Sequence, residues 1–156
     1  MAKLQTDLKE FIELLNSHSV EYLLVGGHAV AFHGHPRYTG DIDFFIRRSE
    51  ANVQRLIAVL SAFGFGSLGI TDRDLLEPKQ ILQLGQPPNR IEILNSISGV
   101  DFDVAWESRI QASMDDQAVF IIGWNELLQN KKAAGRPKDL ADLAKLLAVA
   151  KRKGAD

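Results

Sequence analysis

Hydrophobic and polar residues alternate along the chain with two different periods, which predict helices in some segments and strands in others. Apolar side chains three or four residues apart indicate amphipathic helices, because this spacing places them on one helical face. Four long segments and two shorter ones are expected to be helical on this pattern: 3–17, 50–63, 124–134, 137–151, 28–33 and 104–110.

Short apolar runs bounded by turn residues predict the strands. Five runs qualify: 22–25, 41–46, 80–84, 90–94 and 118–122. A turn at 85–89 separates the third run from the fourth, so these two are expected to form a hairpin. Because helices and strands otherwise alternate, we expect an α/β or α+β fold with a mixed β-sheet flanked by helices.

Composition limits the classes of protein that this chain can represent. Its 156 residues suffice for one domain with a real core, and no repeat or linker divides 1–156. A formal net charge of −2 gives no global basic field for coating nucleic acid or a membrane. The absence of cysteine excludes disulfides, thiolate catalysis and zinc–thiolate sites. With no apolar leader and no membrane span in the pattern, we expect a cytoplasmic protein.

The segment 26–45 carries the most informative polar residues. Gly26 and Gly27 stand between a predicted strand and a predicted helix, where a bare backbone approaches an anion closely. For a lone glycine pair, a plain strand-to-helix turn is the better interpretation. Asp41 and Asp43 alternate with apolar residues on a predicted strand, so both carboxylates project from one face.

An aspartate pair with this spacing suits shared coordination of magnesium, which takes oxygen ligands. An isolated Asp-x-Asp is more often a solvated strand face. Here isoleucine and phenylalanine residues surround the pair, and two like charges in an apolar strand are unfavourable unless a cation compensates them. The surroundings therefore favour a functional site.

Glu92, on the run 90–94, is the candidate for a third acid. Three carboxylates on adjacent strands would form a two-metal site, in which one ion activates an attacking hydroxyl and both stabilise the transferred phosphorus. Asp101 and Asp103 form a second Asp-x-Asp and compete for this third position. Their neighbours indicate a loop that enters a helix, where an aspartate commonly caps.

Basic residues gather late in the chain, at Lys131, Lys132, Arg136 and Lys138. Cations beside a phosphate site would neutralise a triphosphate and its leaving pyrophosphate. Taken singly, each is explained as well by a solvated helix end, where a cation favours the helix dipole. Asp139 and Asp142 share a helical face and are candidates for pairing with nearby lysines.

Three histidines, His28, His33 and His35, raise the question of a zinc site. The chain offers no cysteine ligand, and Gly34 and Pro36 interrupt the spacing. Structural or substrate-orienting roles are therefore favoured for these histidines.

The stretch GGHAVAFHGHPRYTGDIDFF, residues 26–45, resembles the signature of the nucleotidyltransferase superfamily with the polymerase-β-like fold: a glycine pair, a thirteen-residue gap, then Asp-x-Asp. The residues of this segment also resemble those of the branch that contains AbiEii-type toxins and related bacterial proteins of unassigned function. The tail NKKAAGRPKDLADL, 130–143, is similar to lysine and Lys-Asp-Leu motifs of that branch. RIEILNSISGVDFDVAWESR, 90–109, resembles the portion with the third acid.

The resemblance implies a metal-dependent transfer of a nucleoside monophosphate from a nucleoside triphosphate to an acceptor: an RNA end, a protein hydroxyl or a small molecule. Asp41, Asp43 and Glu92 would be catalytic ligands of Mg²⁺, with two ions as an option and Mn²⁺ as a substitute. Lys131 would contact the triphosphate as a fourth catalytic residue. The implied substrate-binding residues are Gly26, Gly27, Arg37, Thr39, Arg136, Lys138 and Asp139.

Two departures from the family pattern support an alternative. Gly27 stands where the superfamily often has serine, and Glu92 stands where aspartate is commoner. The alternative is a catalytically weak or inactive nucleotidyltransferase-fold binding module, such as one half of a toxin–antitoxin pair with a partner protein. A magnesium-dependent hydrolase is less favoured, because no water-activating base accompanies the acids. An oligomer is compatible with a domain of this size.

Overall fold

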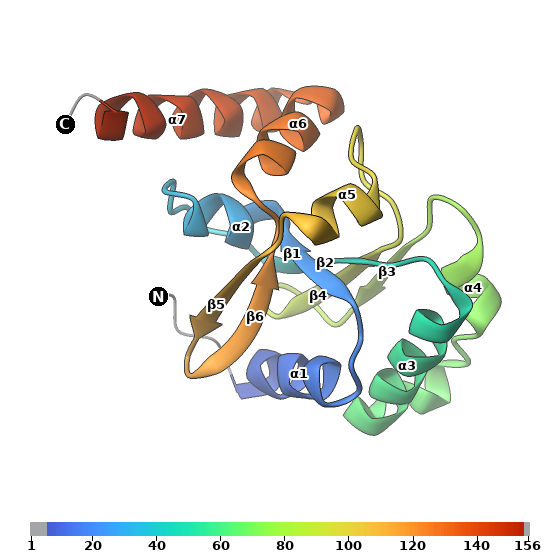
Figure 1. The fold of residues 1–156 in the computed structure, drawn as a ribbon. Helices are drawn as coiled ribbons and strands as arrows, with labels where there is room; N and C mark the ends of the chain where they lie inside the picture. Colours follow the sequence, from blue (N-terminus) through green and yellow to red (C-terminus); the bar gives the residue numbers. More distant parts are fainter. Residues whose placement is uncertain (1–5, 155–156) are drawn as a thin grey trace.

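The computed structural model describes residues 6–154, and in this part of the chain one mixed sheet is covered by helices on both faces (Figure 1). The helices are α1 (Thr6–Ser17), α2 (Gly26–Phe32), α3 (Glu50–Leu60), α4 (Asp72–Leu76), α5 (Phe102–Glu107), α6 (Trp124–Ala134) and α7 (Pro137–Gly154). The strands are β1 (Tyr22–Val25), β2 (Asp41–Ile46), β3 (Ile81–Leu84), β4 (Arg90–Leu94), β5 (Ile110–Met114) and β6 (Gln117–Ile121).

The strands lie in the order β3-β4-β2-β1-β6-β5. The central strand β1 pairs antiparallel with β2 and parallel with β6, and β2 pairs parallel with β4. The antiparallel pairs β3–β4 and β5–β6 complete the two edges. The expected mixed sheet and the hairpin of the third and fourth predicted strands are thus confirmed.

Strand β2 separates the apolar core from the face that carries the acids. Its even-numbered residues point toward α1, where the ring centroids of Phe44 and Phe11 are 5.5 Å apart. Its odd-numbered residues point to the opposite layer, where Phe45 packs against α5. Asp41 and Asp43 share this second face, which α2, α5, α6 and α7 border (Figure 1). The alternation expected from the sequence is therefore correct.

Several element boundaries differ from the expected ones. The first helix is described from Thr6, and residues 3–5 of its predicted range lie outside the described residues. Helix α3 ends at Leu60 and is followed by the π-helical turn η1 (Ser61–Phe65) and the short 3-10 turn η2 (Gly66–Leu68).

Helix α4 was not expected, because five residues are too few to show a helical period. Its sequence signal is a capping box in which Thr71 and Asp74 cap each other's backbone.

The predicted helix 104–110 is wrong at its C-terminal end. Helix α5 ends at Glu107, and Ile110 begins strand β5. The strand forms because residues of β5 pair in antiparallel register with β6, with Ile110 opposite Ile121. This pairing across a tight turn outweighs the local helical spacing.

Within the described range, no helix is both long and apolar enough to cross a membrane.

Candidate metal site and cleft

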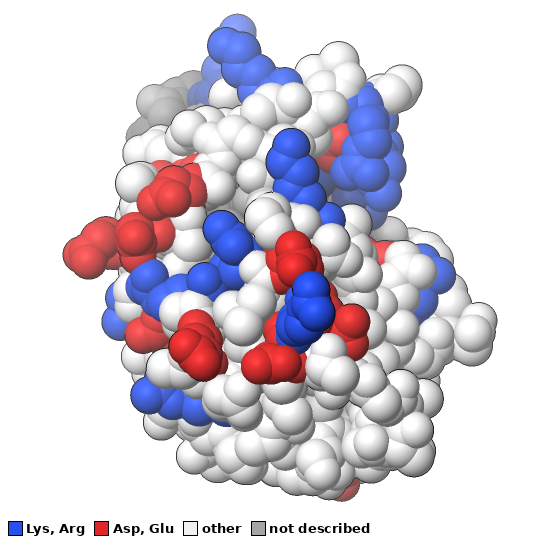
Figure 2. Space-filling view, turned by 90° about the vertical axis from the view of Figure 1, so that its right-hand side faces the viewer, with Lys and Arg blue, Asp and Glu red and all other residues white. Residues whose placement is uncertain are grey.

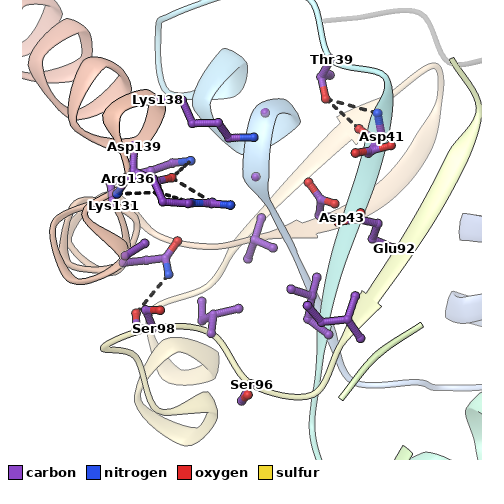
Figure 3. A pocket seen from close by; sticks show the side chains of 18 of the residues that line it. Thr39, Asp41, Asp43, Glu92, Ser96, Ser98, Lys131, Arg136, Lys138 and Asp139 are labelled. Carbon is purple, nitrogen blue, oxygen red and sulfur yellow. Dashed lines mark hydrogen bonds and ion pairs between the residues drawn. The ribbon is translucent and has the colours of Figure 1, made fainter. Parts of the chain in front are cut away.

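The parallel register of β2 and β4 brings the three predicted acids together. Asp41 is aligned with Arg90, and Asp43 is aligned with Glu92. Aligned residues on neighbouring strands project from the same face, so these side chains meet. One carboxylate oxygen from each of Asp41, Asp43 and Glu92 lies within 4.8 Å of the others (Figure 3). No other set of three histidine, aspartate or glutamate side chains within 6–154 converges in this way.

Each acid of this trio has a different partner. Arg90 forks onto Asp41, donating from Nε to Oδ1 at 2.7 Å and from Nη2 to Oδ2 at 3.1 Å. Gln83 Nε2 donates to Glu92 Oε1 at 2.6 Å. Asp43 Oδ1 is buried and receives no hydrogen bond from any residue of the described part. A buried oxygen without a donor is unfavourable, so a bound proton or a bound cation would stabilise this atom.

The acidity of Asp43 is strongly perturbed. Burial raises the pKa of Asp43 to about 8, with further contributions from a proton shared with Glu92 and from the negative charges of Glu92 and Asp41. The charge of Lys138 acts in the opposite direction. Two ionised carboxylates have no hydrogen to share, so either one bound proton or a cation must lie between Asp43 and Glu92.

The glycine pair is required by the packing around these acids. Gly26 has a φ of +67°, and a Cβ there would lie 2.0 Å from Asp43 Oδ2. A Cβ on Gly27 would lie 2.8 Å from Thr39 Cβ and 2.9 Å from Thr39 Oγ1. Side chains at either position would therefore displace Asp43 or Thr39. Thr39 is held in turn by its hydroxyl, which donates to the carbonyl oxygen of Asp41 at 2.9 Å.

These residues line a cleft of about 1110 Å³. The three acids lie along one side, and Figure 3 shows Arg136 and Lys138 extending toward them from the side of α7. Thr39, Arg37 and Lys131 also line the cleft. An apolar part is formed by Ile81, Leu94 and Ile97, with Ser96, Ser98 and Asn130 nearby. The cleft thus joins a strongly charged part to an uncharged one.

Lys131 of α6 lies buried between two aspartates of α7. Its ammonium is 3.3 Å from Asp139 Oδ1 and 3.2 Å from Asp142 Oδ2, and at most 5% of any of these three side chains is exposed. Arg136 forks onto Asp139 (2.6 and 3.2 Å) and Arg37 forks onto Asp142 (2.9 and 2.8 Å). Burial acts to raise the pKa of both aspartates, but their hydrogen bonds and the nearby cations lower it overall.

The other candidate ligands lie apart from the trio. Asp101 is the N-cap residue of α5, although its side chain makes no capping hydrogen bond, and Asp103 pairs with Arg47. His33 Nε2 lies 2.8 Å from the carbonyl oxygen of Ile122, and burial lowers the pKa of His33. These contacts are structural ones, as the sequence favoured.

Sequence reasoning missed both side chains that donate to the acids, Arg90 and Gln83, and the uncharged residues of the cleft. A signal was available, because Arg90 stands two residues before Glu92 on the same strand and so shares its face. Its alignment with Asp41 depends on the pairing of strands 49 residues apart and is visible only in the fold.

The face in Figure 2 carries acidic and basic side chains interspersed, without a single basic surface. This distribution agrees with the small net charge of the chain. The basic residues that matter for the site are thus those inside the cleft.

No family model and no curated protein matches the sequence. Among solved structures, the chain is similar to a candidate nucleotidyltransferase from Thermotoga maritima, with a TM-score of 0.60 and 16% identity over 90% of each chain. It is also similar to an antigenic nucleotidyltransferase-like protein from Paracoccidioides brasiliensis, with a TM-score of 0.54 and 20% identity over 95% of this chain and 79% of that one. At such identities a likeness establishes architecture, and the chain therefore has the nucleotidyltransferase fold.

Proposed function

We propose that the protein is a metal-dependent nucleotidyltransferase, which transfers a nucleoside monophosphate from a nucleoside triphosphate to an acceptor hydroxyl. The convergence of Asp41, Asp43 and Glu92 in a cleft whose other side carries cations supports this proposal. The acceptor is an RNA end, a protein hydroxyl or a small molecule. The motifs of 26–45 and 130–143 further favour the branch of AbiEii-type toxins.

The donor set of the trio fits a hard divalent cation. All three side chains offer carboxylate oxygens, which Mg²⁺ and Mn²⁺ prefer over softer ligands. The buried Asp43 Oδ1 lacks a donor among residues 6–154 and gains a partner when a cation binds. Bound magnesium would supply charge neutralisation at the transferred phosphorus and a lowered pKa for the attacking hydroxyl.

Arg37, Arg136 and Lys138 are the groups we assign to the triphosphate. Arg136 and Lys138 reach across the cleft toward the acids (Figure 3). The side chain of Arg136 is 65% exposed, so it can contact a ligand while it remains hydrogen-bonded to Asp139. Guanidinium groups bind phosphate oxygens through paired hydrogen bonds, which makes these arginines suited to the role.

Lys131 has a different position from these three cations. It lines the cleft, but its ammonium is bound by both Asp139 and Asp142. We assign it the role of holding the two aspartates, which in turn orient Arg136 and Arg37. Asp139 is then the orienting acid of the substrate site.

Thr39 offers a hydroxyl in place of the serine that the superfamily often has at position 27. Its Oγ1 would lie 2.9 Å from a Cβ at Gly27, which is the space that a serine side chain there would use. Gly26 and Gly27 leave the backbone bare beside this hydroxyl. A phosphate contact by Thr39 would require its hydroxyl hydrogen to turn from the carbonyl oxygen of Asp41 to the phosphate.

In the proposed transfer one bond forms, one bond breaks and one proton moves. The acceptor oxygen bonds to the α-phosphorus, the bond from that phosphorus to the bridging oxygen breaks, and pyrophosphate leaves. In this proposed transfer, the acceptor proton passes to a carboxylate of the Asp43–Glu92 pair, which lines the cleft. Arg37, Arg136 and Lys138 stabilise the charge on the departing pyrophosphate.

Calorimetric titration of each nucleoside triphosphate with Mg²⁺ tests the site directly. Wild type is expected to bind in a magnesium-dependent manner, and Asp43→Asn is expected to lose this binding. Asp7→Asn is the matched control, because Asp7 is exposed on α1. Transfer is then followed with α-labelled triphosphate and RNA or the protein itself as acceptor. Full transfer by both Asp41→Ala and Asp43→Asn overturns the proposal.

A second candidate function is a nucleotide-binding module with little or no transfer, such as one half of a toxin–antitoxin pair. The fork of Arg90 on Asp41 favours it, because a permanent cation already occupies one of the proposed metal ligands. A stable complex with a partner protein that is indifferent to Asp43→Asn, together with absent transfer, supports this candidate. Loss of that complex in Asp43→Asn counts against it.

A further inference from the structure

We propose that Arg90 takes the place of one cation in the acidic site, so that the nucleotide-free protein binds one divalent ion tightly, at Asp43 and Glu92. The inference rests on the proposed function and concerns the metal stoichiometry of the same site. It follows from how β2 and β4 align their charged residues.

The two aligned pairs at the site differ in charge. Asp41 lies opposite Arg90, which makes a pair of opposite charges, whereas Asp43 lies opposite Glu92, which makes a pair of like charges. Opposite charges across neighbouring strands stabilise each other, and like charges repel. The need for a cation is therefore concentrated at Asp43 and Glu92, where the buried Asp43 Oδ1 has no donor among the described residues.

The interaction of Arg90 with Asp41 is expected to persist when a metal ion binds. Both oxygens of Asp41 accept from the guanidinium, at 2.7 and 3.1 Å, and arginine does not lose its charge at any accessible pH. Arg90 belongs to a strand held on both sides, by β2 and by β3, so its backbone is fixed. Its Nη2 also lies 3.9 Å from Glu92 Oε1, which places the guanidinium between Asp41 and Glu92.

The charges of the site match one divalent ion. Three carboxylates and one guanidinium leave two negative charges, which a single divalent cation neutralises. Arg136 and Lys138 face the same space from α7 and add further positive charge (Figure 3). A second divalent ion would then meet net repulsion, which a low-dielectric cleft strengthens. The phosphates of a bound triphosphate remove this repulsion, so a second ion is expected only with nucleotide.

Manganese titration without nucleotide tests the stoichiometry, with free Mn²⁺ followed by electron paramagnetic resonance. Wild type is expected to bind one tight equivalent. Arg90→Gln, which keeps an amide but loses the charge, is expected to bind a second equivalent on the order of tenfold more tightly than wild type does. Arg90→Lys keeps the charge and is expected to retain one tight equivalent, and Arg55→Gln, at an exposed position on α3, is the control.

The outcomes separate this inference from the proposed function. Two equally tight equivalents in wild type, or an unchanged stoichiometry in Arg90→Gln with circular dichroism that shows a folded protein, overturn the role of Arg90 alone. An Arg90→Lys protein that behaves like Arg90→Gln also overturns it, because charge is then not the cause. Absence of Mn²⁺ binding in every variant overturns the inference together with the metal-dependent function. Adding Asp41→Asn to Arg90→Gln is expected to remove the second equivalent.

Discussion

Gly26 and Asp43 approach so closely that no side chain fits at position 26: a Cβ there would lie 2.0 Å from the Oδ2 atom of Asp43. A glycine is thus required at the start of α2 by the close approach of Asp43, a proposed metal ligand. Its φ of +67° is a second requirement, since L side chains rarely adopt it.

Gly26→Ala is expected to lower the free energy of unfolding by about 1–3 kcal/mol through backbone strain and to abolish Mn²⁺ binding. Gly69→Ala provides a matched control, because Gly69 has a φ of +69° with nothing within 4 Å of its Cβ position. Urea unfolding and Mn²⁺ titration measure the two effects. Equal destabilisation and equal Mn²⁺ affinity in the two variants would contradict the contact with Asp43.

A side chain introduced at position 27 would occupy the space that Thr39 fills, and a double variant tests this overlap. Gly27→Ser alone is expected to weaken triphosphate binding and stability, because its Cβ would lie 2.8 Å from Thr39 Cβ. Gly27→Ser with Thr39→Gly removes both the Cβ and the hydroxyl of Thr39 from that space and is expected to recover both properties in part, since a hydroxyl is again present. Calorimetry and thermal unfolding of the four proteins give the coupling. Additive effects would rule out a shared space.

The pH dependence of stability follows from the raised pKa of Asp43. In the metal-free protein this carboxyl holds a proton in the folded state between about pH 4 and pH 8, whereas the unfolded chain has lost it. The folded state then binds more protons, so this contribution to stability falls as pH rises through that window, by at most about 1.4 kcal/mol per pH unit.

Asp43→Asn removes this contribution, and the difference between wild type and variant isolates it. The comparison is needed because burial lowers the pKa of His28 and His33, which act in the opposite direction below about pH 6.5. Urea unfolding from pH 5 to 9 with a chelator present measures both proteins. Parallel pH profiles would show that Asp43 titrates normally.

Lys131 is expected to be the most sensitive lysine for stability. Lys131→Met leaves Asp139 and Asp142 buried without the cation between them, which is expected to lower the free energy of unfolding by about 3–5 kcal/mol. Lys132→Met, at the exposed next position, is expected to change it by no more than about 0.5 kcal/mol. Urea denaturation compares the two, and similar small changes would show that the network contributes little.

The sequence predicted which face of β2 carries the acids, because alternation along one strand is a local property. The pairing of Asp139 and Asp142 with a lysine was also foreseen as an alternative, and Lys131 supplies it. Local spacing cannot give the register between strands, however. That Asp43 meets Glu92, and that Arg90 meets Asp41, depends on pairing between distant segments.

Strand β5 shows a different limit in the fold. Its residues Ile110–Met114 alternate between covered and exposed positions, which is a local strand signal, but the helical spacing before it extended the predicted helix over Ile110. The burial of Lys131 is a tertiary property, because it requires α6 and α7 to pack together. At the candidate site, what the sequence missed is therefore mainly what forms between elements.

The ion pair of Arg37 with Asp142 joins residues 105 positions apart. During synthesis on a ribosome, the three acids of the candidate metal site are complete once residue 92 has emerged, whereas Asp139 and Asp142 appear only with α7. A nascent chain would therefore contain the proposed metal ligands well before it contains the aspartates that orient the arginines we assign to phosphate. On the proposed function, metal binding and nucleotide binding would be acquired at different stages of synthesis.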